Sequence, residues 1–340
     1  MHLHAAFFGQ NIMSKALYRL ISHMIGILAV LLVLQSAYAQ TALTQGIWPE
    51  RPVTLVTPFA AGGINDLLAR LTAEQLQASL QQPFLVENQP GGAGVLAASR
   101  VAKAVPDGYL LLFTPIFQIT MAPLTHVVTF DPANDFVPIA SVATSPFVIA
   151  ASSSVPANTL AEFIAYVKSK PGQLAFGSAG PGSLTHVCSA IFLKSAALDM
   201  VHVPYRGVAP AMTDLLANQI QMVSATPVEI KPYLQSGKVR PLAVTSRERS
   251  RHLPTVPTVA ETLNSPPVAT YNGLFAPRHT PDDIVARIAR ELRNSVEFQD
   301  RLEKLGVEPL VSTPKEFVKI IAADADQMRG YVIDLNIKAE

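Results

Sequence analysis

The chain has 340 residues, of which 26 are Lys or Arg and 25 are Asp or Glu, giving a formal net charge of +1 at pH 7. A hydrophobic fraction of 49% excludes a disordered chain and allows a large buried core in one or two domains. The balanced charge argues against nucleic-acid binding, and the single cysteine, Cys188, excludes an internal disulfide or a cysteine-based metal site.

Residues 1–39 show the order of features of a secretory signal peptide. Basic residues precede an uninterrupted apolar run, Ile25–Leu34, and small residues follow it. This order predicts cleavage near Ala39-Gln40, and the run is shorter than the ~20 residues that a membrane span needs. We therefore expect an exported, soluble protein whose start is Met1 or Met13, with an uncleaved anchor as the alternative.

Short apolar segments bounded by Gly, Pro, Asp or Asn alternate with helical patterns along the rest of the chain. The alternation predicts mostly parallel sheets covered by helices on both faces. The predicted strands are Val53–Thr57, Phe84–Glu87, Tyr109–Phe113, Val137–Val142, Phe147–Ala151, Leu174–Gly177, Met200–Val203, Gln221–Ser224, Val239–Thr245 and Gly273–Ala276.

Helix starts are visible at three places. The apolar spacing that begins at Ile64 predicts a helix after the first strand. Thr280, followed by Pro281 and two acids, predicts a helix capped by the Thr280 hydroxyl. The segment Thr313–Glu316 has the spacing of a capping box.

Two boundaries suggest that the chain crosses twice between two lobes. One lies near Thr144–Pro146, and the other is the Pro-rich stretch Leu253–Pro267. We expect residues 48–145 plus 272–340 to form lobe 1 and residues 146–271 to form lobe 2. This topology places a cleft between the lobes.

Two segments combine a strand, a glycine-rich loop and a helix start, and each is predicted to lie in a different lobe. They are Pro58–Gly63 and Gly177–Ser183. Helix starts carry unpaired N–H groups, and glycines allow close approach, so each segment is suited to bind an anion or is a simple tight turn. The pair predicts that both loops bind the same anion, one from each lobe. In a third turn, Tyr205–Gly207, Arg206 is the candidate cation of the cleft.

The remaining motifs are weaker indications of function. Gly92–Ala97 matches a dinucleotide-binding pattern, but no strand-end acid follows at the required spacing. Asp66 either accepts hydrogen bonds from the first loop or faces a cationic ligand group. Ser183 and His186 could form a nucleophile pair. The histidines lack metal-ligand spacing, so we expect no metal, no cofactor and no catalytic set.

A series of short motifs runs in order from residue 48 to the end of the chain. They are Trp48-Pro49, Pro58–Gly63 with Asp66, Val86–Gly91, Pro106–Tyr109, Gly177–His186, His202–Ala211, Leu242–Ser246 with Arg249, Val256–Thr258, and Gly273–Pro277 with Thr280-Pro281. Together they resemble the Bug family, the periplasmic solute receptors of the tripartite tricarboxylate transporter type.

The resemblance implies an α/β, two-lobed periplasmic-binding-protein fold of the Venus flytrap type II, with a hinge and an interdomain cleft for a small carboxylate. In such receptors the first two glycine loops hold one carboxylate through backbone groups and waters. By position, the resemblance assigns ligand-binding roles to Phe59, Ala60, Gly62, Gly63, Asp66, Ser178, Ala179, Gly180, Gly182, Ser183, His186, Tyr205 and Arg206.

The sequence departs from the family pattern at three positions. Ala225 stands where the family often has Asp, Tyr271 where it often has Trp, and Gln89 where it often has Arg. Loss of the pocket acid at Ala225 favours a dicarboxylate, or an aromatic or aliphatic monocarboxylate, over an amino acid.

These features predict an exported periplasmic solute-binding protein, not an enzyme. We expect a monomer that captures a small organic carboxylate, closes by a hinge, and presents the closed form to transporter subunits or to a sensor ectodomain. The alternative is a secreted two-lobed hydrolase that uses Ser183 and His186, which would need an aligned base and an orienting acid.

Overall fold

The computed structural model describes residues 48–91, 94–125 and 127–335. The predicted signal peptide, residues 1–39, lies outside the described residues. The described residues from Arg51 onward belong to one compact unit. No helix within this described part is both long and apolar enough to cross a membrane.

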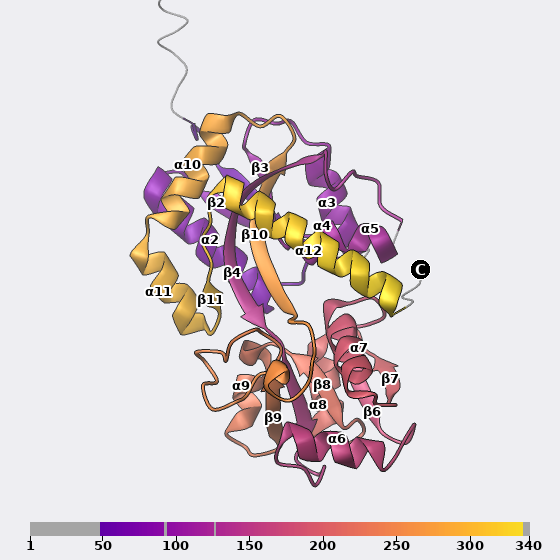
Figure 1. The fold of residues 1–340 in the computed structure, drawn as a ribbon. Helices are drawn as coiled ribbons and strands as arrows, with labels where there is room; N and C mark the ends of the chain where they lie inside the picture. Colours follow the sequence, from indigo (N-terminus) through magenta and orange to yellow (C-terminus); the bar gives the residue numbers. More distant parts are fainter. Residues whose placement is uncertain (1–47, 92–93, 126, 336–340) are drawn as a thin grey trace, which may run out of the picture. The chain divides into compact units, whose positions relative to one another are not determined.

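One sheet has six strands in the order β11-β4-β10-β3-β1-β2. Its strands are β1 (Val53–Thr57), β2 (Phe84–Asn88), β3 (Leu110–Pro115), β4 (Phe136–Pro146), β10 (Ala269–Pro277) and β11 (Glu308–Pro309). Strand β1 pairs in parallel with β2 and β3, whereas β10 is antiparallel to β3 and β4. The long strands β4 and β10 therefore lie side by side (Figure 1).

A second sheet has five strands in the order β7-β6-β8-β5-β9. Its strands are β5 (Val148–Ser152), β6 (Ala175–Ser178), β7 (Val201–Pro204), β8 (Met222–Ala225) and β9 (Val239–Val244). Strand β6 is parallel to β7 and β8, and β5 is antiparallel to β8 and β9.

The expectation of mostly parallel sheets is wrong, because both sheets are mixed. The reversed strands are β10 and β11 in the six-stranded sheet and β5 in the five-stranded sheet. Strand β4 leads directly into β5, and β10 begins as the chain returns. The first strand after each crossing, β5 or β10, therefore runs against the βα strands of the sheet that it enters.

The two crossings are tied together by Thr245. Its Oγ1 accepts a hydrogen bond from the Phe147 N–H at 2.9 Å and donates to the Val268 carbonyl at 2.6 Å. Its backbone pairs with the same two residues, through Thr245 N to Phe147 O and Val268 N to Thr245 O, each at 2.9 Å. A single side chain thus joins the outgoing strand to the returning one.

Helices cover the sheets, and the predicted helix after the first strand begins at Ile64 as expected. The helices are α2 (Ile64–Leu80), α3 (Val95–Ala102), α4 (Phe117–Thr120), α5 (Ala122–Thr125), α6 (Leu160–Lys168), α7 (Leu184–Ala196), α8 (Val208–Leu216), α9 (Pro227–Leu234), α10 (Asp282–Arg293), α11 (Val296–Leu305) and α12 (Pro314–Asp334), with a 3-10 turn at Val259–Glu261. The capping box at Thr313 and Glu316 is confirmed.

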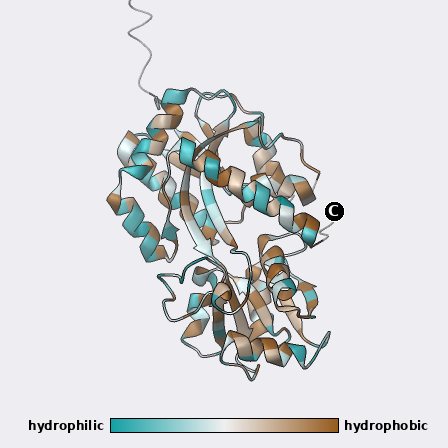
Figure 2. Ribbon diagram, in the orientation of Figure 1, coloured by the Kyte–Doolittle hydropathy of each residue, from teal (hydrophilic) through white to brown (hydrophobic). Residues whose placement is uncertain are grey.

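The predicted cap at Thr280 is wrong. The N-cap of α10 is Pro281, and no side chain caps it. The Thr280 hydroxyl instead donates to the Pro277 carbonyl at 2.7 Å, which closes the turn after β10. The apolar side of α10, visible as alternating colours in Figure 2, packs inward through Ile284, Ile288 and Leu292.

The core of the six-stranded sheet includes a cluster beneath α3 and α12. Val56 and Leu112 of the sheet pack there with Ala97 of α3 and Phe317 of α12. Gly273 of β10 faces the same helix, because a Cβ at this position would collide with the Phe317 ring. This close approach fixes which face of β10 points toward α12.

Candidate functional site

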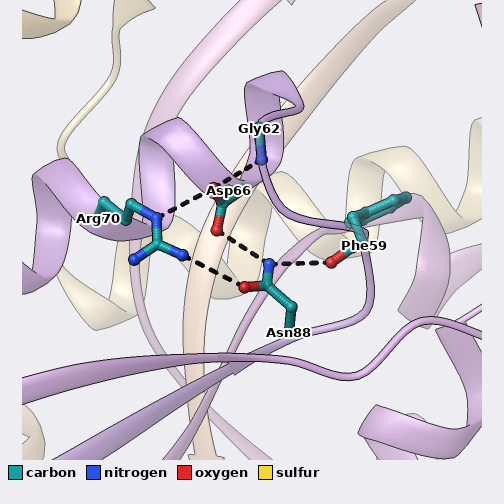
Figure 3. A network of polar contacts seen from close by, with 5 residues as sticks. All are labelled: Phe59, Gly62, Asp66, Arg70 and Asn88. Atoms are coloured by element: carbon teal, nitrogen blue, oxygen red, sulfur yellow. Dashed lines mark hydrogen bonds and ion pairs between the residues drawn. The ribbon is translucent and has the colours of Figure 1, made fainter.

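The first glycine loop joins β1 to α2 and is held by a buried carboxylate (Figure 3). Asp66 is 2% exposed and accepts the Gly62 N–H at 2.9 Å. It also accepts Arg70 Nε at 3.0 Å and Asn88 Nδ2 at 2.9 Å. Asn88 Nδ2 in turn donates to the Phe59 carbonyl at 3.0 Å. Asp66 therefore holds its own loop, the first of the two roles that the sequence leaves open.

The protonation of Asp66 follows from these contacts. Burial by itself raises the pKa of this carboxyl. The hydrogen bonds from Arg70, Gly62 and Asn88 stabilise the charged form more strongly, so the pKa lies below its ordinary value. A carboxylate thus sits behind the loop at neutral pH, and its charge is balanced by Arg70.

The start of α2 presents backbone donors that the protein does not use. Gly63 is the N-cap, and no side chain caps the helix. Within the part of the chain that the structure describes, the N–H groups of Gly63, Ile64 and Asn65 donate to no acceptor. Residues 60–63 are exposed. Free N–H groups at a helix start, together with the positive end of the helix dipole, favour an anion.

The second glycine loop, between β6 and α7, has the opposite character. Its N–H groups donate to side chains of the same turn: Ala179 to Thr185 Oγ1 at 2.9 Å, Gly180 to Ser178 Oγ at 3.1 Å, and Gly182 to His186 Nδ1 at 3.2 Å. The Leu184 and Thr185 N–H groups have no acceptor among the described residues, but both residues are buried. Side chains of the second loop therefore occupy three of its own N–H groups.

Two histidines stiffen the second loop. The rings of His186 and His202 stack with centroids 4.1 Å apart, and Phe176 stacks on His202 at 4.9 Å. Ser178 Oγ lies 2.7 Å from His202 Nε2. Burial lowers the pKa of His202 to about 4, with a further contribution from His186, and burial also lowers the pKa of His186. Both rings are therefore neutral at pH 7 and act as packing and hydrogen-bonding groups.

The hydrolase alternative requires a bond that these contacts do not include. Ser183 is the N-cap of α7, and its hydroxyl donates to the Gly180 carbonyl at 2.7 Å. The imidazole of His186 accepts from Gly182 through Nδ1. Among the described residues, no hydrogen bond joins the Ser183 hydroxyl to the His186 ring.

The third turn, between β7 and α8, lies against the second loop and keeps two of its N–H groups free. Tyr205 N donates to the Ser178 carbonyl at 3.0 Å, and Tyr205 Oη donates to Asp214 at 2.6 Å. Arg206 is exposed and forms no ion pair within the described ranges. In that same part of the chain, the Arg206 and Gly207 N–H groups have no acceptor.

The residues predicted from the sequence thus form two groups. Phe59, Ala60, Gly62, Gly63 and Asp66 gather around the start of α2. The residues of the second loop gather with the third turn, namely Ser178, Ala179, Gly180, Gly182, Ser183, His186, Tyr205 and Arg206. No hydrogen bond between described residues joins the two groups, so their shared ligand stays a prediction.

Sequence reasoning missed the residues that set these loops. Arg70 and Asn88 hold Asp66, and His202 holds Ser178. The spacing of Asp66 and Arg70, one helical turn apart, is a usable signal for the first contact. The pairing of Ser178 with His202 joins neighbouring parallel strands and has no local signal.

Two of the residues that depart from the family pattern, Ala225 and Tyr271, differ in how deeply they are buried. Ala225 is fully buried at the end of β8, and Tyr271 is half-buried near the start of β10. Burial raises the pKa of Tyr271, so its hydroxyl is neutral. In the described part of the chain, no group of three or more His, Cys, Asp or Glu side chains could hold a metal ion.

Several solved structures are similar to this one. R. palustris Rpa4515 with adipate is 31% identical with a TM-score of 0.80, and the match covers 86% of this chain and 100% of that one. The periplasmic binding protein BugD is 31% identical with a TM-score of 0.76, at 86% and 100% coverage. MatC from Rhodopseudomonas palustris with bound malate is 32% identical with a TM-score of 0.74, at 84% and 100% coverage.

These likenesses define the class of the fold, which is the two-lobed α/β fold of periplasmic binding proteins, as predicted. The family profile described as "Tripartite tricarboxylate transporter family receptor" matches residues 68–337. Because this match spans more than half of the chain, the protein belongs to that receptor family, and the predicted kinship with the Bug proteins is confirmed. Membership places the protein among periplasmic solute-binding receptors.

Proposed function

We propose that the protein captures a small organic carboxylate in the periplasm and presents it to a tripartite transporter or to a sensor ectodomain. The observation that carries this proposal is the set of free N–H groups at the start of α2, which follow an exposed loop held by Asp66. The similar proteins Rpa4515 and MatC, in structures with adipate and malate, support a carboxylate as the ligand class.

In this proposal the ligand lies between the predicted lobes, residues 48–145 plus 272–340 and residues 146–271. The first loop binds the carboxylate through backbone N–H groups. The third turn supplies Arg206 from the other lobe, and the second loop contributes shape. Closure by a hinge removes water around the charge and strengthens these contacts. The protein acts as a monomer, after loss of its signal peptide near Ala39-Gln40.

A thermal-shift series with adipate, malate and monocarboxylates tests the proposal. A ligand at a hundredfold its Kd stabilises the folded state by about 2.7 kcal/mol, so the melting temperature should rise with ligand concentration. If no carboxylate raises the melting temperature, the proposal is wrong.

Gly63→Val tests the assigned donors. Gly63 has φ −78° and ψ 168°, which any residue adopts, and a Cβ there would meet only the Ala60 carbonyl at 3.8 Å. We expect a folded variant whose valine blocks the approach to the helix start and abolishes binding. Gly180 is a poorer choice, because its φ of +122° strains any side chain.

Gly330→Val in α12 is the matched control, because a Cβ there has open space. This variant should keep the wild-type ligand response. A Gly63→Val variant that binds as well as the control would contradict the assignment of the first loop.

A further inference from the structure

Two buried side chains of the six-stranded sheet have oxygens with no hydrogen-bond partner in the described part of the chain. They are Thr57 Oγ1 and Asn272 Oδ1. Thr57 is 0% exposed and Asn272 is 4% exposed. A buried polar group without a partner destabilises a fold, so native proteins keep few of them and each needs a reason.

Thr57 is the last residue of β1 and directly precedes the first loop. Its neighbour Val56 packs in the cluster beneath α3 and α12. Since successive side chains of a strand point to opposite faces, Thr57 points to the other face of the sheet. No residue of α2 belongs to that cluster, so the Thr57 hydroxyl lies on the side of the sheet away from α3 and α12, at the end of β1 from which the first loop departs.

Asn272 reaches the same face from a distant part of the sequence. It pairs with Pro115, the last residue of β3, while Gly273 pairs with Thr114. Gly273 faces Phe317 of α12. Asn272 therefore faces away from α12, on the same side as Thr57.

The two oxygens also lie at the same edge of the sheet. Thr57 ends β1 and Pro115 ends the parallel neighbour β3, so the edge is the one from which the first loop departs. Strand β3 separates β1 from β10, and Val56 is level with Leu112, which pairs with Phe275. Thr57 is therefore level with Leu274, and Asn272 lies two strands away and two residues further along the sheet, about 12 Å from Thr57 between Cα atoms. A short carboxylate with a second polar group, or a water attached to it, spans such a gap.

We propose that Thr57 and Asn272 are specificity-determining residues, which hydrogen-bond a hydroxyl or second carboxylate of the ligand whose first carboxylate the loop holds. A hydroxyl and an amide can each donate to a carboxylate and accept from a hydroxyl. The inference rests on the proposed function. It assigns the ligand to carboxylates with a second oxygen-bearing group, in preference to plain alkyl carboxylates.

The test compares stability and affinity in variants of equal shape, Thr57→Val and Asn272→Leu. Without ligand, replacing an unsatisfied polar group by an apolar one of similar shape removes its desolvation cost, so the melting temperature should rise. The Kd for adipate or malate, measured by calorimetry, should rise about tenfold, which equals about 1.4 kcal/mol. The Kd for hexanoate, a six-carbon chain with one carboxylate, should change less than twofold.

Thr114→Val is the matched control. Thr114 is equally buried, but its hydroxyl donates to the Pro115 carbonyl at 3.3 Å, and it lies on the face toward α12. This variant should lose some stability and keep the wild-type Kd. The opposite signs of the two stability changes separate an oxygen reserved for a ligand from one with a structural role.

An unchanged Kd in Thr57→Val and Asn272→Leu overturns the inference whatever the melting temperature does, since the oxygens then serve a buried water or nothing. A raised Kd together with a lowered melting temperature also overturns it, because the effect is then general damage. If Asn272→Leu does not fold, Thr57→Val decides. Failure of wild type to bind adipate, malate and hexanoate overturns the proposed function itself, which is a different result.

Discussion

The two glycine loops share one plan and differ in what their donors do. Each joins a parallel strand to a helix start. Between Pro58 and Ile64 the first loop holds only Phe, Ala and Gly, and its side-chain support comes from Asp66 and Asn88 outside it. The second loop has hydroxyl and imidazole groups that turn back onto its own N–H groups. In the first loop the N–H groups stay free for an anion because no polar side chain within the loop competes for them.

The largest expected effect comes from Asp66→Ala, which removes the support of the first loop. The Gly62 N–H, Arg70 and Asn88 lose their common acceptor. We expect the free energy of unfolding to fall by about 2–3 kcal/mol, less than for a fully buried pair because Arg70 is exposed. Carboxylate binding should be lost. Urea unfolding and calorimetry measure the two effects.

The pH dependence gives a second measure of the same contact. Since the pKa of Asp66 is lowered in the folded protein, its stabilisation is present above the ordinary value near 3.9 and disappears as the pH falls through the folded value. Because Asp66→Ala lacks this carboxyl, its free energy of unfolding should depend less on pH in that range than the wild-type value does. If Asp66→Ala binds the carboxylate with the wild-type Kd, the N–H groups of the first loop do not need Asp66, and the proposed difference between the two loops is wrong.

The next effect is a pH effect in the second loop, tested by His202→Phe. The pKa of His202 is about 4, below its ordinary 6.5, so the unfolded chain binds the proton more readily. Wild-type stability should therefore decrease as the pH falls from 6.5 to about 4. Phenylalanine keeps the stacking on His186 and cannot titrate, so the decrease should be shallower in thermal unfolding.

The Kd of His202→Phe provides a second test of the same loop. Because three N–H groups of the second loop are occupied within the loop, His202→Phe should change the Kd less than the Asp66 variant does. A complete loss of binding in His202→Phe would mean that the second loop holds the ligand directly, as the sequence alone predicts.

The smallest expected effect on stability comes from Arg206→Gln in the third turn. Arg206 is exposed, so the free energy of unfolding should change by less than about 0.5 kcal/mol. The Kd for adipate should rise several-fold, and its dependence on salt should weaken. Arg206→Lys keeps the charge and should keep the salt dependence. Equal salt dependence in wild type and Arg206→Gln would remove Arg206 from the proposed site.

The sequence predicts the strands well because their signals are local. Val53–Thr57 is a strand with those bounds. The misses have non-local causes. Strand β10 begins at Ala269, four residues before the predicted Gly273, because pairing with β4 extends to Pro146. Strand β11, Glu308–Pro309, is too short to show alternation. The direction of β5 and β10 depends on which sheet the chain enters, which no local pattern encodes.

The candidate site is predictable to the level of its backbone. Glycine at positive φ, as at Gly62 and Gly180, follows from the loop pattern. The occupation of the Gly182 N–H by His186 four residues later is a local contact that sequence reasoning could have found. The orientation of Asn272 could not be found, because it depends on the register of β10 against β3 and on Phe317.

The Thr245 contacts limit how the molecule can move. Its hydroxyl and backbone bind Phe147 of the outgoing passage and Val268 of the returning one. Two segments fastened at one residue cannot slide along each other, because sliding would break hydrogen bonds in a buried place. Rotation about Thr245 preserves these hydrogen bonds. A given rotation displaces the parts of the protein far from Thr245 the most, so a ligand bound there senses the largest movement.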